Sequence, residues 1–148
     1  MTKKLFILMM GVLLIATLLA GCGGRPGNLR EWVDANQDEW IALEAESAEE
    51  ARQMSAMFGV DIASAFEVVG DHELVMNFTF SDPAFSVGTE IGDILSAALS
   101  DEIESDAAFY YEMAEGMRRS MRVDTLYYTL RYLDANGNVL AERTFAGH

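Results

Sequence analysis

The apolar run near the N-terminus most constrains what the chain can fold into, because it decides which residues are left to fold. Lys3 and Lys4 are followed by an apolar stretch from Leu5 to Ala20 that is interrupted only by Gly11 and Thr17. A positively charged start before a short apolar stretch is typical of a secretory signal peptide. A transmembrane helix is the alternative, but it needs about 20 apolar residues and this run is shorter. We therefore expect residues 1–21 to be removed.

The run ends in Leu18-Leu19-Ala20-Gly21-Cys22, which resembles the lipobox of bacterial lipoprotein signals. In such signals the cysteine thiol receives a diacylglyceryl group, and the chain is cut just before it. This predicts cleavage between Gly21 and Cys22 and a lipid on Cys22, which would anchor the chain at the extracytoplasmic face of the cell membrane. Cleavage elsewhere to give a soluble exported protein is the other interpretation. The small residues before Cys22 and the lack of a second cysteine favour lipidation.

The mature chain would be strongly acidic. Loss of Lys3 and Lys4 leaves eight arginines against 24 acidic residues, a formal net charge of −16. A chain without lysine cannot form a lysine Schiff base, and this charge should repel nucleic acid and anionic lipid headgroups. With Cys22 acylated, no disulfide can support the fold. We expect residues 22–28 to be a lipidated cysteine and short tether, and residues 29–148 to form one domain stabilised by burial.

Helical spacing dominates the first part of this domain. Asn28 suits an N-cap, and Gly59 suits the position just after a helix C-terminus. Ser47 and Glu50 fit a capping box, which would start a second helix. One bent helix and two shorter ones therefore remain open. The apolar stripe comprises Leu29, Trp32, Val33, Trp40, Ile41 and Leu43.

A longer helical pattern runs from about Thr89 to Arg119 and predicts the main core helix. A helix of this length would rise about 45 Å, longer than most sheets are wide. Gly116 or the acid-rich stretch 101–106 could bend or end it. Its expected core stripe comprises Ile91, Ile94, Leu95, Ala98, Leu99, Ile103, Ala107, Tyr110, Met113, Ala114 and Met117.

Two stretches of alternating residues each predict a β-hairpin. The first spans residues 60–80 and turns at Gly70-Asp71-His72. The second spans residues 125–145 and turns at Asp134–Asn138. Two hairpins can join as an antiparallel sheet of about four strands, with one long and one or two shorter helices packed on one face. The predicted fold class is therefore α+β.

The chain resembles the small lipoproteins of Gram-positive bacteria classed as domain-of-unknown-function family 4854. The resemblance covers most of the mature chain, and it implies an extracytoplasmic lipoprotein without assigning an activity or a catalytic residue. It rests on the lipobox, Leu29-x-x-Trp32-Val33-x-x-Asn36, the Gly70-Asp71 turn, the stretch from Leu99 to Phe109 with Ser105 and Ala107, and Arg131-Tyr132-Leu133-Asp134-Ala135-Asn136-Gly137.

The sequence offers little for catalysis or metal binding. His72 lies in a predicted turn and His148 is the last residue, which leaves no pattern for a Ser-His-Asp triad or a zinc site. Asp134 begins a motif like a calcium loop, but its glycine is misplaced for an EF-hand, so we interpret it as a turn. The acidic clusters on the predicted helices are better interpreted as solvated surface. We expect no catalytic residue, metal or cofactor.

Tyr127 is the aromatic residue best placed to meet a partner. It shares a strand face with Thr129 and Arg131, so it should be exposed if the other face is buried. We expect a non-enzymatic module that binds an envelope protein or a small solute, with Tyr127, Thr129 and Arg131 as the candidate surface. A small envelope enzyme or enzyme inhibitor using surface carboxylates is the alternative, and it predicts a cleft holding two carboxylates of raised pKa. A purely structural envelope component is a third possibility.

Overall fold

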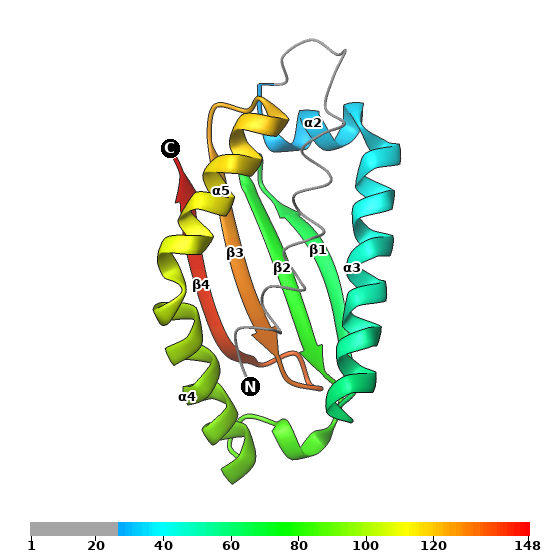
Figure 1. Ribbon diagram of the computed structural model, residues 1–148, viewed down its shortest axis with the longest axis vertical. Helices are drawn as coiled ribbons and strands as arrows, with labels where there is room; N and C mark the ends of the chain where they lie inside the picture. The colour runs from blue at the N-terminus through cyan, green and yellow to red at the C-terminus, as the bar shows by residue number, and fades with distance from the viewer. Residues whose placement is uncertain (1–26) are drawn as a thin grey trace.

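The structure is a computed structural model that describes residues 27–148 (Figure 1). The predicted cleavage site at Gly21 and Cys22 lies outside the described residues. Within residues 27–148, no helix combines the length and apolar character needed to cross a membrane. In chain order the elements are α2 (Leu29–Ala35), α3 (Gln37–Phe58), β1 (Ile62–Val69), β2 (Glu73–Phe80), the 3₁₀ helix η1 (Pro83–Phe85), α4 (Glu90–Ser105), α5 (Ala107–Met121), β3 (Leu126–Leu133) and β4 (Val139–Gly147).

The first helical region is two helices, and the break lies at Asn36 rather than near Ser47. The Asn36 side chain donates to the Trp32 carbonyl at 2.7 Å, and its backbone leaves the helical region with φ −129° and ψ 48°. Asparagine side chains compete in this way for helix backbone groups. Ser47 instead lies inside α3, buried, with its hydroxyl 2.7 Å from that of Ser64 on β1. Its capping-box pattern was therefore misleading.

The predicted long helix is also two helices, α4 and α5, which meet at Asp106. Of the two suggested positions, the acid-rich stretch is where the helix ends, and Gly116 continues within α5. Carboxylates at a helix C-terminus oppose the helix dipole, and α4 carries Asp101, Glu102 and Glu104 in its last turns. The helical stretch is therefore divided at one of the two positions suggested for a bend or an end, instead of forming one continuous helix.

The four strands lie in the order β1-β2-β3-β4. The two predicted hairpins are confirmed, since β1 pairs antiparallel with β2 and β3 pairs antiparallel with β4. The central pair is different: β2 and β3 run parallel. Helices α4 and α5 return the chain from the end of β2 to the end of the sheet where β2 began, so β3 must start beside the start of β2 (Figure 1). The sheet is therefore mixed rather than antiparallel, and the α+β class is confirmed.

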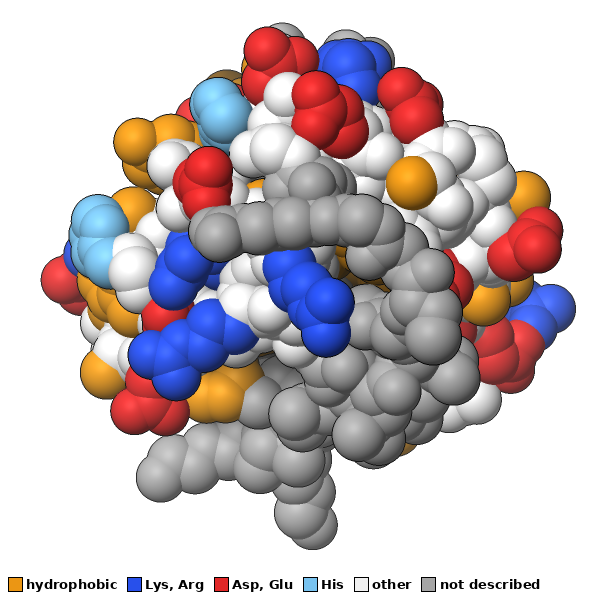
Figure 2. Space-filling model, turned by 90° about the horizontal axis from the view of Figure 1, so that it is seen from above, with side chains coloured by type: hydrophobic (Ala, Val, Ile, Leu, Met, Phe, Trp, Pro, Cys, Tyr) orange, Lys and Arg blue, Asp and Glu red, His pale blue; other side chains and the backbone are white. Residues whose placement is uncertain are grey.

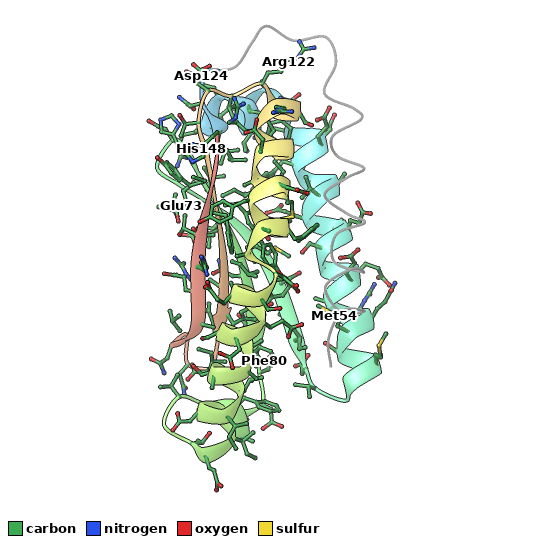
Figure 3. The ribbon with its side chains drawn as sticks, turned by 60° about the vertical axis from the view of Figure 1, so that its left-hand side comes forward. Met54, Glu73, Phe80, Arg122, Asp124 and His148 are labelled. Atoms are coloured by element: carbon green, nitrogen blue, oxygen red, sulfur yellow. The ribbon has the colours of Figure 1, made fainter. Side chains whose placement is uncertain are left out.

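All helices that contact the sheet lie on one of its faces (Figure 3). Helix α3 packs against β1, whereas α4 and α5 pack against β4 and α5 also reaches β3. The strand residues that face these helices form the core, as the alternation predicted. They include Leu74, Met76, Phe78 and Phe80 on β2 and Tyr128, Leu130 and Tyr132 on β3, all buried.

Three residues of the predicted core stripe, Ile91, Ile94 and Ala98, are exposed and lie outside the core. Ile91 is 52% exposed and Ile94 is 64% exposed, whereas Leu99 and Ile103 of the same helix are buried. Helix α4 therefore packs on the sheet through a face that is rotated away from Ile91 and Ile94.

The loop before α4 is held tightly against the rest of the fold. The Thr89 side chain caps the helix by accepting from the Gly92 N–H at 2.9 Å. Gly92 also passes so close to Ser86 that a Cβ at this position would lie 2.0 Å from the Ser86 carbonyl oxygen. Only glycine fits there, so the start of α4 has one arrangement against the loop.

Asp134 fastens the same loop to the β3–β4 turn. Its carboxylate accepts from the Val87 N–H at 3.0 Å, from the Asn136 and Asn138 N–H groups at 2.9 Å each, and from the Asn138 side chain at 3.1 Å. Burial alone would raise the pKa of Asp134, but these hydrogen bonds lower it to about 2. The predicted turn is confirmed, and its aspartate joins two distant segments.

Candidate functional site

The sheet face turned away from the helices carries the predicted partner surface. The strand register places residues of all four strands in rows across this face, and Figure 3 shows Glu73 on the side of the sheet opposite the helices. The rows, in strand order, are Val69, Glu73, Tyr127 and Ala146; Glu67, Val75, Thr129 and Thr144; Ala65, Asn77, Arg131 and Glu142.

Thr129 lies at the centre of this face and is only 1% exposed. Its hydroxyl donates to Glu73 Oε1 at 2.6 Å and lies 2.7 Å from the Thr144 hydroxyl. A hydroxyl has one hydrogen, so Thr144 must be the donor to Thr129. The chain of hydrogen bonds joins β4, β3 and β2. Thr129 therefore supports the surface from beneath and does not present its hydroxyl to a partner.

Arg131 is joined to acidic neighbours on both sides. Its Nε donates to the Glu142 carboxylate on β4, and its Nη1 lies 3.8 Å from Glu67 Oε2 on β1. Glu67 also accepts from the Asn77 amide at 3.4 Å. The Arg131 side chain remains 27% exposed. Its charge is thus largely compensated within the sheet.

Tyr127 is the part of the predicted surface that is open to solvent. It is 42% exposed, and its backbone N–H donates to the His72 carbonyl at 2.8 Å, which fixes the start of β3. Val69, at the other end of the same row, is 40% exposed. The face therefore offers a tyrosine ring and an aliphatic side chain in one row, next to the rows of paired polar residues. Strand alternation located Tyr127, but the burial of Thr129 depends on cross-strand partners that one strand does not show.

Two carboxylates have the raised pKa that the enzyme alternative requires. Burial, and then the nearby Glu46, raise the pKa of Glu50 to about 7. Burial, and then Asp106, raise the pKa of Glu102. Glu50 belongs to α3, which packs against β1, and Glu102 belongs to α4, which packs against β4. The two carboxylates therefore start from opposite edges of the sheet instead of converging as a catalytic pair. Within residues 27–148, no group of three or more His, Cys, Asp and Glu side chains could hold a metal ion.

The raised pKa of Glu50 predicts a stability change with pH. As pH rises from 4.5 to about 7, the unfolded chain loses the Glu50 proton before the folded chain does, so the folded state loses stability. Glu50→Gln should therefore unfold like the wild type at pH 4 and be about 1 kcal/mol more stable at pH 8, a value reduced for solvent screening. Urea unfolding between pH 4 and 8 measures this difference. Glu44→Gln on the exposed side of α3 controls for the lost charge, and an equal gain there would contradict the prediction.

One comparison with known proteins gives a match. The sequence model described as "Domain of unknown function (DUF4854)" matches residues 38–145, which run from the start of α3 into β4 and contain α4, α5 and the strands between. No curated protein and no solved structure matches the chain. The match covers all of β1, β2 and β3 and most of β4, so it includes Tyr127, Thr129 and Arg131.

Proposed function

The chain belongs to the family of the domain of unknown function DUF4854, which assigns no activity, and we propose that it is a lipid-anchored extracytoplasmic lipoprotein of a Gram-positive bacterium that acts as a non-enzymatic binding module. Residues 1–22 would direct the chain to the membrane, and Cys22 would carry the lipid anchor. Its binding partner would be an envelope protein or a small solute, met on the helix-free face of the sheet. The domain would then act as a rigid support for a binding surface and would not enclose an active site.

The observation that carries the binding proposal is the pairing of polar groups on the helix-free face. Glu73, Thr129 and Thr144 satisfy one another, and Arg131 is held between Glu142 and Glu67. Side chains that are already fixed lose little conformational entropy when a partner binds. Tyr127 rises from this fixed surface, and tyrosine is enriched in protein interfaces.

The distribution of charge agrees with an anchor at the N-terminal end. Arg30 lies on α2, and Arg118, Arg119 and Arg122 lie at the end of α5, at the same end of the molecule (Figure 1). Figure 2 looks onto this end and shows arginine side chains gathered among carboxylates. A tether of a few residues before α2 would hold this end nearest the bilayer. An end of the acidic protein that carries arginines would then face the lipid headgroups, which reduces repulsion.

Lipidation is tested by metabolic labelling with a fatty acid. Wild-type protein should carry the label and partition with membranes, whereas Cys22→Ala should lose all label because no other cysteine is present in the chain. External protease added to intact protoplasts should digest the wild-type domain. Equal labelling of wild type and variant, or full protection from protease, would overturn the lipoprotein proposal.

The binding surface is tested by photocrosslinking on intact cells, with p-benzoylphenylalanine in place of Tyr127. Tyr111 on α5 is a matched control, since it is also 42% exposed but lies on the helical side of the domain. We expect crosslinked adducts from position 127 that are missing from position 111. The same adducts from both positions would show that the sheet face is not the binding surface.

A further inference from the structure

Helix α4 exposes an apolar stripe that the fold does not use. Ile91, Ile94 and Ala98 follow one another at spacings of three and four, so they lie on one face of the helix. Ile91 and Ile94 are more than half exposed, Ala98 is exposed, and Val87 in the loop just before the helix is 49% exposed. Three of the nine large exposed apolar side chains among residues 27–148 thus occur within residues 87–94. Isolated exposed apolar residues are ordinary, but a contiguous set indicates a contact surface.

The stripe is held in a fixed position. The Val87 N–H donates to the buried Asp134 carboxylate at 3.0 Å. The Thr89 hydroxyl lies 2.8 Å from both the Ala84 and the Ser86 carbonyl oxygens, and it also caps α4. Close contact of Gly92 with Ser86 fixes the angle at which the helix leaves the loop. A surface that is already ordered loses little conformational entropy when a partner binds.

The charges around the stripe select the kind of partner. Glu90, Asp93 and Asp101 are exposed on the same helix, and residues 83–105 contain no lysine or arginine. Arg143 on β4 is the basic residue paired with α4, and its partner there is Glu104. Two copies of α4 facing each other would bring their carboxylates together, which is unfavourable. An apolar stripe with an acidic border fits a helix that has apolar residues along one face and basic residues beside them.

We propose that the Val87, Ile91, Ile94 and Ala98 stripe docks a basic amphipathic helix of a partner protein. This surface is separate from the helix-free sheet face, and the proposal holds whether or not Cys22 is lipidated. The partner helix would have apolar side chains that repeat every three or four residues, with lysine or arginine beside them.

The test measures binding of a probe peptide to the full chain in nanodiscs of zwitterionic phosphatidylcholine. The probe is a fluorescent synthetic peptide of about four helical turns, with leucine on one face and lysine on the other. Binding is followed by anisotropy. The double variant Ile91→Ser/Ile94→Ser should weaken binding at least tenfold, because it removes the centre of the contact. The double variant Glu90→Gln/Asp101→Asn should weaken binding about threefold and reduce its salt dependence.

The matched control is Ile41→Ser/Met57→Ser on α3, where both side chains are as exposed as those of the stripe. This control should bind the probe like the wild type. Equal binding by the stripe variant and the wild type would overturn the proposal. So would equal binding of a peptide with the same composition in scrambled order, which would indicate charge attraction alone. Self-association of the wild type that Ile91→Ser/Ile94→Ser abolishes would assign the stripe to a second copy instead.

Discussion

Gly92→Ala should lower the free energy of unfolding by about 3 kcal/mol. A Cβ at this position would lie 2.0 Å from the Ser86 carbonyl oxygen and 2.7 Å from its carbonyl carbon. These are backbone atoms, so they cannot rotate away as a flexible side chain would. Relief requires moving either α4 or the loop, and the loop is already held by Thr89 and Asp134. Thermal unfolding should show a melting temperature about 10 °C lower.

Gly116→Ala is the matched control, because it makes the same chemical change inside a helix. A Cβ at Gly116 would meet nothing within 4 Å, and the residue lies in the middle of α5. Alanine has the better helix propensity, so this variant should gain about 0.5–1 kcal/mol. The two substitutions should therefore shift stability in opposite directions. A loss at both positions, or at neither, would contradict the geometry described for Gly92.

Asp134→Ala should lower the melting temperature by about 10 °C, because it leaves three backbone N–H groups and one amide without their acceptor. Asp134→Asn should cost less, since one amide oxygen can still accept. The hydrogen bonds hold the pKa of Asp134 at about 2, below its usual 3.8. Its contribution to stability is therefore fully present above pH 3.8 and is lost as pH falls toward 2.

Acid unfolding separates this role from a general charge effect. The wild type should lose stability between pH 4 and pH 2 more steeply than Asp134→Asn, which has no carboxylate at this position to protonate. Asp101→Asn is the control, because it removes an exposed charge from α4. It should lose stability between pH 4 and pH 2 as steeply as the wild type does. Identical acid profiles for wild type and Asp134→Asn would refute the assigned role.

Local periodicity predicted the strands and hairpins because one sheet face is buried. Leu74, Met76 and Phe78 alternate with Glu73 and Asn77, and the structure buries the first three as expected. The direction of β3 relative to β2 was not predictable from that pattern. It depends on how α4 and α5 cross the sheet, and alternation carries no information on strand direction.

Helical periodicity identified the helices but not which apolar residues they bury. Ile91 and Ile94 fit the same spacing rule as Leu99 and Ile103, yet they are exposed. The face that packs on the sheet is chosen by close contacts such as that of Gly92 with Ser86, and a spacing rule ignores such contacts. Thr129 was likewise assigned to an open surface, because its cross-strand partners Glu73 and Thr144 come from distant parts of the sequence.

The parallel pairing of β2 with β3 has a consequence for folding. The β1–β2 hairpin closes through a short turn. The β2–β3 ladder instead pairs Glu73 with Tyr127, which are separated by the whole α4–α5 segment, so we expect it to form later. Until β3 arrives, one edge of β2 is therefore unpaired, and its Leu74, Val75 and Met76 are all residues that the finished sheet buries. An unpaired apolar edge favours aggregation. We therefore expect aggregation of this chain to be most favoured before β3 pairs with β2.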